Sequence, residues 1–266
     1  MTWLAVTLIG IGLADLVRSR STARAHVAAH VVAPATIVVT ALLAGLHGWA
    51  DALALLLAAL GSAAWLELSA RTQRDGQRAG RALAAIAVTL VVPLLFSGAA
   101  STPDGLLGRW LRWADLPGGL GPDPARVLLL AGLVLLNVAT ANVLVRLVLL
   151  TIGALRPDQV TAPPVPQPAD RLKGGRLLGP MERLVILGLG LAGEFGAAGL
   201  VIAAKGLLRF PEIQASARSR ASPSGGGDPT GSYPGGPAGI DDVTEYFLVG
   251  SFVSWLLALA SLTLAA

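Results

Sequence analysis

Four side chains in the first quarter of the chain are of the types that bind metal ions. They are Asp15, His26, His30 and Glu67. His26 and His30 are four residues apart and share one face of any helix that includes both. Two imidazoles and two carboxylates suit zinc or another first-row divalent metal, which would activate water to hydrolyse a lipid or lipid-linked substrate. The alternative, which we favour, is that they are interfacial side chains that reach toward water where membrane helices end.

Glu194 is the second candidate for chemistry, because it lies halfway along the apolar stretch Leu184–Ala204. An ionisable group in the middle of a bilayer costs about 2.5–3.5 kcal/mol or more, so it is expected to face protein or water. One hypothesis makes Glu194 the ion or proton site of a small transporter or channel. The alternative, which we favour, is a protonated, neutral carboxyl group that is hydrogen-bonded between helices.

Other polar residues within apolar stretches are expected to support helix packing. Asn137 and Asn142 are predicted to make hydrogen bonds between helices. Arg146 shares a helix face with Asn142, and we expect it to reach lipid headgroups or a carboxylate such as Glu182.

Two further contacts are expected near the C-terminus. Lys205 and Glu245 are predicted to pair at the outer ends of neighbouring helices. Gly188, Ala192 and Gly196 form a stripe of small residues that would let another helix approach closely. We expect that helix to belong to the same chain, and self-association of two copies is the alternative.

The elements that must position these residues are membrane helices. The chain has 266 residues, 54% hydrophobic and 14% charged, with a mean hydropathy of +0.68, whereas soluble domains carry roughly 25% charged residues. Stretches of about 20 apolar residues are long enough to cross a bilayer. Seven qualify: Thr2–Val17, Val27–Leu46, Ala50–Ala70, Ala82–Ala99, Val127–Ile152, Leu184–Ala204 and Tyr246–Ala265. The sequence therefore predicts one all-α membrane domain, a bundle of about seven transmembrane helices, with short interfacial helices at Leu106–Trp113 and Lys205–Ala217.

Composition and missing motifs exclude several classes of function. The absence of Cys excludes disulfides, zinc fingers and iron–sulfur clusters. No P-loop, dinucleotide-binding fingerprint or G-x-S-x-G elbow is present, since the G-x-G-x-x-G match at Gly188–Gly193 lies inside an apolar helix. The net charge of +4 is spread over many short connections without interleaved aromatic residues. No cofactor is established beyond the hypothetical divalent metal, and we expect membrane lipids, not nucleic acids, as partners.

Connections and their charges predict the orientation. A Pro-rich linker covers residues 157–170, and a Gly-, Pro- and Ser-rich loop covers 222–239. The first helix is preceded by no positive charge and followed by three arginines, which is typical of a retained helix with its N-terminus outside. Seven spans then put eleven Lys and Arg residues in cytoplasmic connections and seven in outer ones, and place the C-terminus in the cytoplasm. Trp3, Trp49, Trp110 and Trp113 would form an outer aromatic belt.

Ordered blocks near the C-terminus resemble an uncharacterised family of bacterial inner-membrane proteins, domain of unknown function 3307. The blocks are Gly175–Gly179, Glu182-Arg183-Leu184, Gly199–Lys205, Arg209-Phe210 and Glu245–Gly250. The resemblance implies that Glu182, Arg183, Lys205, Arg209 and Glu245 are family-matching polar residues. It also implies that 222–239 is an insertion, because the family joins its last two helices by a short basic segment.

The N-terminal half departs from the family pattern, in which a His precedes an Asp by four residues twice and a further His opens the second helix. Asp15 and His30 (or His26) fit that pattern, whereas Ile11 stands in place of the first His. Ala63 and Glu67 stand in place of the second pair. Because the family has no assigned reaction, the resemblance implies a bacterial cytoplasmic membrane location but no substrate. We expect a structural, lipid-associated or accessory membrane protein, with a metal-dependent hydrolase and a small transporter as alternatives.

Overall fold

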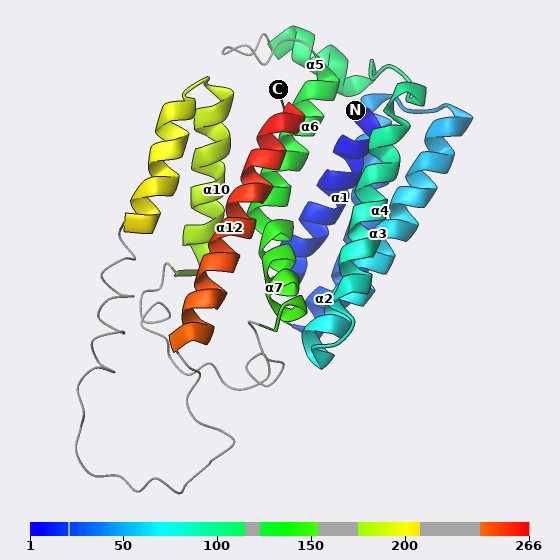
Figure 1. Ribbon diagram of the computed structural model, residues 1–266. Helices are drawn as coiled ribbons and strands as arrows, with labels where there is room; N and C mark the ends of the chain where they lie inside the picture. The colour runs from blue at the N-terminus through cyan, green and yellow to red at the C-terminus, as the bar shows by residue number, and fades with distance from the viewer. Residues whose placement is uncertain (21, 115–122, 154–174, 208–239, 266) are drawn as a thin grey trace, which may run out of the picture.

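The computed structural model describes residues 1–20, 22–114, 123–153, 175–207 and 240–265, and within these ranges every regular element is a helix (Figure 1). The predicted Pro-rich linker at 157–170 and the loop at 222–239 lie outside the described residues. The helices are α1 Thr2–Arg18, α2 Ala23–Ala44, α3 Trp49–Asp75, α4 Ala79–Leu95, η1 Ser97–Ala99, α5 Leu106–Ala114, α6 Pro124–Leu135, η2 Leu136–Thr140, α7 Ala141–Thr151, α10 Gly175–Leu191 and α12 Ile240–Ala265. A further apolar helix, Phe195–Leu207, is called the return helix below.

Four helical segments in the described part of the chain are long and apolar enough to cross a membrane. They are Ala23–Ala44, Trp49–Asp75, Pro124–Thr151 and Leu248–Ala265. Helices α1, α4 and α10 have 17 residues each, which corresponds to about 25 Å of helix. The predicted all-α, membrane-compatible architecture is confirmed at this level, whereas the predicted number of seven spans is not.

The predicted sixth span, Leu184–Ala204, is two helices and not one. Helix α10 ends at Leu191, and Gly193 adopts a left-handed backbone conformation with φ of +82°. Such a glycine is a common helix terminator, because it lacks the Cβ that disfavours this conformation. The amide of Glu194 donates to the carbonyl of Leu189 at 2.8 Å, and the return helix then runs back along α10 (Figure 1).

This reversal changes where the chain ends. The N-terminus and the C-terminus lie at the same end of the bundle, the upper end in Figure 1. Seven spans would place the termini at opposite ends, because that prediction makes Leu184–Ala204 one continuous helix and not the hairpin of α10 and the return helix. The direction of α12 is therefore the reverse of the predicted one.

The predicted interfacial helix Leu106–Trp113 is present as α5, which lies across the upper end of the bundle (Figure 1). It buries Gly108 and Leu111 and leaves the side chains of Trp110 and Trp113 exposed. The prediction that Trp3 belongs to the outer aromatic belt is wrong, because this side chain is 6% exposed and belongs to the core. The predicted helix at Lys205–Ala217 coincides with the return helix only up to Leu207, and the rest lies outside the described residues.

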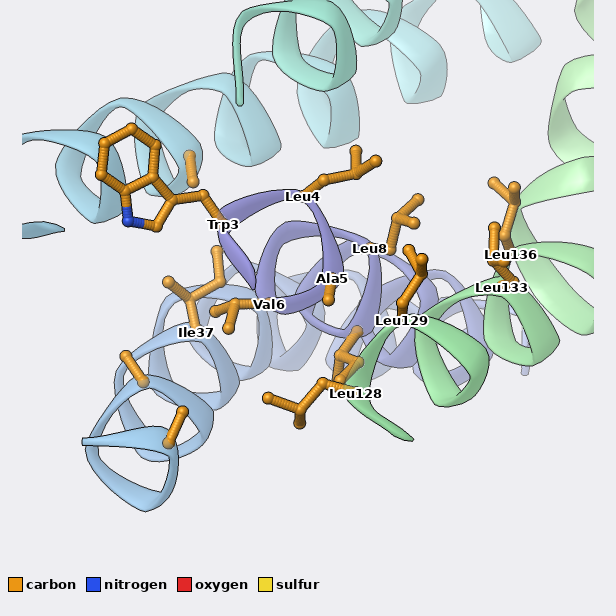
Figure 2. Packing of buried hydrophobic residues seen from close by; sticks show 14 of the residues in the cluster. Trp3, Leu4, Ala5, Val6, Leu8, Ile37, Leu128, Leu129, Leu133 and Leu136 are labelled. Carbon is orange, nitrogen blue, oxygen red and sulfur yellow. The ribbon is translucent and has the colours of Figure 1, made fainter. Parts of the chain in front are cut away.

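Helix α1 is the centre of the bundle. Fourteen of its 17 residues are buried, and it contacts α2, α3, α4, α6 and η2. Figure 2 shows its first two turns packed between Ile37 of α2 and a row of leucines on α6 and η2. Helices α10 and α12 then pack on the continuous rod formed by α6, η2 and α7.

Glycines allow the close packing around α1. A Cβ atom placed on Gly12 would lie 2.6 Å from the Cβ of Leu135 on α6 and 3.1 Å from its carbonyl carbon. Neither atom can move independently of the helix backbone, so a side chain at this position would push α1 and α6 apart. Gly188 on α10, in contrast, has nothing within 4 Å of its Cβ position.

This contrast generates a test with a matched control. We expect Gly12→Ala to destabilise the protein by about 1–3 kcal/mol, because it overpacks a tight helix contact. Gly188→Ala is expected to leave stability unchanged or to raise it by up to about 1 kcal/mol, because Ala has the higher helix propensity. The measurement is the unfolding of both variants in detergent micelles. Equal stability of the two would contradict the central position of α1.

Candidate functional site

A buried ion pair holds the lower end of α1. The carboxylate of Asp15 lies 2.7 Å from the guanidinium of Arg18 one helical turn later, with side-chain exposures of 0% and 6%. The indole N–H of Trp65 on α3 donates to the same carboxylate at 3.1 Å. Arg18 also donates to the hydroxyl of Ser69 at 2.7 Å and lies over the ring of Trp65. We call these four residues the Asp15 cluster.

A second carboxylate fixes the upper end of the same two helices. The indole N–H of Trp3 on α1 donates to Asp51 on α3 at 2.7 Å. Asp51 also accepts from the amide of Gly48 at 2.9 Å and from the hydroxyl of Ser101 at 2.6 Å. These residues form the Asp51 cluster, which ties the start of α3 and the chain before α5 to α1.

The two clusters join α1 to α3 with exchanged roles. At the upper end α1 supplies the tryptophan and α3 the aspartate, and at the lower end α1 supplies the aspartate and α3 the tryptophan. Both helices run in the same direction in Figure 1, so the two bonds lie at opposite ends of one helix pair. The pair is therefore held in a single register along its length.

A buried arginine forms the third polar group, in the C-terminal half. Arg183 on α10 is 2% exposed, and its Nε donates to the backbone carbonyl of Asn137 at 2.9 Å. Its two terminal nitrogens donate to the hydroxyl of Ser254 at 2.8 Å and to the side-chain oxygen of Asn142. The side-chain amide of Asn137 in turn donates to Ser261 at 2.8 Å. These five residues are the Arg183 cluster.

The local structure explains why this arginine finds a backbone acceptor. Asn137 lies in η2, a π-helical turn in which the regular ladder of α-helical hydrogen bonds is interrupted. The interruption frees a main-chain carbonyl, which would otherwise bond within the helix. Ser254 and Ser261 are seven residues apart on α12 and so project from the same helix face. Three helices therefore supply only neutral partners to Arg183.

The four residues predicted to bind a metal do not come together. Asp15 is occupied by Arg18 and Trp65, whereas His30 and Glu67 face each other at 3.9 Å with about 40% of each side chain exposed. Glu67 also pairs with Arg71, and His26 is exposed. In the described ranges no group of three or more His, Asp or Glu side chains has a geometry that could hold a metal ion.

Glu194 does not lie within a continuous helix. It lies at the tip of the hairpin, immediately before the return helix, and its side chain is exposed. The hypothesis of an intramembrane ion site at Glu194 depended on a position in the middle of a helix, and Glu194 does not have that position. The stripe of Gly188, Ala192 and Gly196 is broken by the same turn, because Ala192 lies in the turn and Gly196 in the return helix.

Glu182 has a different partner from the predicted one, whereas the predicted pairing of Lys205 with Glu245 falls on a side chain outside the described residues. Lys205 on the return helix pairs with Glu182 on α10, because the hairpin brings the two helices side by side. This contact replaces the expected pairing of Glu182 with Arg146. Glu245 belongs to α12, and its side chain is outside the described part, as is Arg209. Arg183, which was expected at a helix end, is buried instead.

Sequence reasoning missed most partners in the three clusters. Trp65, Asp51 and Ser101 carry no local signal, because their roles depend on contacts between helices. Two signals were available: Asp15 and Arg18 have the i,i+3 spacing of a helical ion pair, and buried serines recur on α12 at 251, 254 and 261. Small polar residues on one face of an apolar helix are typical of contacts between membrane helices.

The Asp15 cluster predicts a large loss of stability on removal of one charge. Asp15→Asn leaves Arg18 buried without a counter-charge, and we expect a cost of about 3–5 kcal/mol in the free energy of unfolding. The control is Asp104→Asn, since Asp104 pairs with Arg112 at 2.7 Å with both side chains more than half exposed, and such pairs contribute at most about 1 kcal/mol. Unfolding in detergent measures both, and an equal loss would show that Asp15 is not a buried structural charge.

Comparison of the chain with protein-family models, with curated proteins and with solved structures found no match in any of the three. The resemblance to the domain of unknown function 3307 family therefore stays a prediction from the sequence.

Proposed function

We propose that the chain is an integral membrane protein with a structural, lipid-associated or accessory role, and that its buried polar residues hold its helices together. The observation that carries this proposal is that the buried ionisable groups are engaged in contacts within the protein. Asp15, Arg18, Asp51 and Arg183 are each 7% exposed or less. Each makes its contacts to another helix or to its own ion-pair partner. Side chains satisfied in this way stabilise a fold, but are not free to act on a substrate.

The charges favour one orientation of this protein in a bacterial cytoplasmic membrane. When α10 and the return helix are counted as two crossings, the described connections at the lower end hold Arg18, Arg20, Arg24, Arg71, Arg74, Arg78 and Arg81, and the sequence has six more Lys and Arg residues in the segments 154–174 and 208–239. The upper end has three, Arg109, Arg112 and Arg126. Positive charges are concentrated on the cytoplasmic side of membrane proteins. We propose eight crossings, with the lower end in the cytoplasm and both termini outside.

Reporter insertions test this orientation. We expect insertions directly after Gly153 and directly after Leu207 to report the same side, the cytoplasm, and a fusion at the C-terminus to report the outside. A continuous sixth span would instead separate the first two sites. Opposite signals from the insertions at 153 and 207 would contradict the hairpin as two crossings.

A transporter is the second candidate, because one observation favours it. Arg183 is a buried cation beside a π-helical turn, and both features occur at functional sites in membrane proteins. In this proposal Arg183, and not Glu194, would contact the transported ion or solute. The metal-dependent hydrolase has no comparable support, since two of its four residues, Asp15 and His30, contact different partners.

Flux measurements separate the two candidates. We expect the protein, reconstituted in liposomes, to give no proton or ion flux above that of empty vesicles, because every buried charge is engaged in helix packing. The matched variant is Arg183→Gln, which keeps hydrogen-bonding capacity but removes the charge. A protein-dependent flux that Arg183→Gln abolishes without lowering protein abundance would overturn the scaffold and favour the transporter.

A further inference from the structure

Arg146 is a charged residue that has no ion pair with any carboxylate in the described part of the chain. It lies on α7, five residues before the last residue of that helix, Thr151, and its side chain is exposed. Five residues of helix correspond to about 7.5 Å. The Cα atom of Arg146 therefore lies within the apolar part of the helix, and its long side chain can reach the membrane interface at the lower end of the bundle. Long basic side chains near the ends of membrane helices commonly reach the interface in this way.

The acidic side chains of the described spans are engaged elsewhere. Asp15 pairs with Arg18, and Glu182 pairs with Lys205. Glu67 pairs with Arg71 on α3. No ion pair links a described carboxylate to Arg146. Among the described carboxylates none supplies a counter-charge to Arg146, whose side chain is exposed on the outer face of α7.

The surroundings of Arg146 favour a ligand that arrives from the lipid. Helix α12 packs on α7 through Gly250, which approaches Val145 and Leu149, and the other core-facing side is occupied by Leu147 and Leu150. Asn142, one turn above Arg146, is also exposed and accepts a hydrogen bond from Arg183. The exposed face of α7 thus carries the guanidinium of Arg146 next to the side-chain amide of Asn142, which is already bonded to the guanidinium of Arg183.

We propose that Arg146 binds the phosphate of an anionic phospholipid at the arginine-rich end of the bundle. A guanidinium matches a phosphate with two parallel hydrogen bonds. Basic residues near the cytoplasmic surface attract anionic lipids. Asn142 and Arg183 are positioning residues, because the bond from the buried Arg183 to the exposed Asn142 holds this face of α7 in place. The site deepens the proposed function, on which it rests, by naming the lipid class and the residue that binds it.

The experiment measures binding of phosphatidylglycerol and of phosphatidylcholine to the purified full chain by native mass spectrometry. The wild type is expected to retain phosphatidylglycerol in preference to phosphatidylcholine, and Arg146→Gln is expected to weaken phosphatidylglycerol binding by about fivefold. Arg146→Lys keeps the charge and should retain most of the binding. The matched control is Arg81→Gln, an exposed arginine at the same end of the bundle on α4.

Equal loss of lipid binding in Arg146→Gln and Arg81→Gln would overturn the site, as would binding of phosphatidylcholine as strong as that of phosphatidylglycerol. Competition by inorganic phosphate at concentrations equal to that of the lipid would show that the apolar tails contribute nothing, and would also overturn it. If Arg146→Gln does not fold, the Arg146→Lys variant and the lipid preference of the wild type still decide whether Arg146 binds the lipid phosphate. Failure of the proposed function appears separately as a protein-dependent flux in liposomes, which these lipid measurements do not report.

Discussion

The structure depends on how polar groups are satisfied in the buried interior of an apolar bundle. Hydrocarbon offers no hydrogen-bond partners, so each buried donor or acceptor must find one within the protein. Helix α1 meets this requirement through two bonds of the same kind, from Trp3 to Asp51 and from Trp65 to Asp15. They hold α1 against α3 at both ends, and α2, α4, α6 and η2 also pack against α1.

Much of the fold could be predicted from hydropathy, because the length of an apolar stretch nearly determines a membrane helix. The stretch Thr2–Val17 corresponds to α1, Thr2–Arg18, and the amphipathic stretch Leu106–Trp113 corresponds to α5. The turn at Gly193 could not be found in this way. A window of about 20 residues averages over a two-residue break, and Gly193 and Glu194 lie between apolar segments on both sides. That one turn divides the predicted span into two antiparallel helices and brings the C-terminus to the same end of the bundle as the N-terminus.

The polar sites were predictable only in part, because their chemistry depends on partners from other helices. Asp15 could be singled out by its residue type, but its partner Trp65, and Ser69, which binds the paired Arg18, are about 50 residues away on α3. Arg183 was expected near a helix end, whereas the π-helical turn at η2 supplies a carbonyl that allows it to be buried. The same tertiary contacts explain why Asp15 and His30 do not meet. A carboxylate that neutralises Arg18 within the core is unavailable to a metal site at the surface.

The central claim is that the exchanged Trp–Asp bonds hold α1 in place, and a double-mutant cycle tests it most directly. The cycle combines Trp3→Phe, which removes the indole N–H, with Asp51→Asn, which removes the carboxylate charge; the volume lost with the smaller Phe ring is common to both Phe proteins and cancels in the coupling energy. Unfolding of the four proteins in detergent gives the coupling energy between the two positions. The account predicts a favourable coupling of about 0.5–2 kcal/mol, in the range measured for hydrogen bonds between membrane helices. Additive effects within about 0.3 kcal/mol would contradict it.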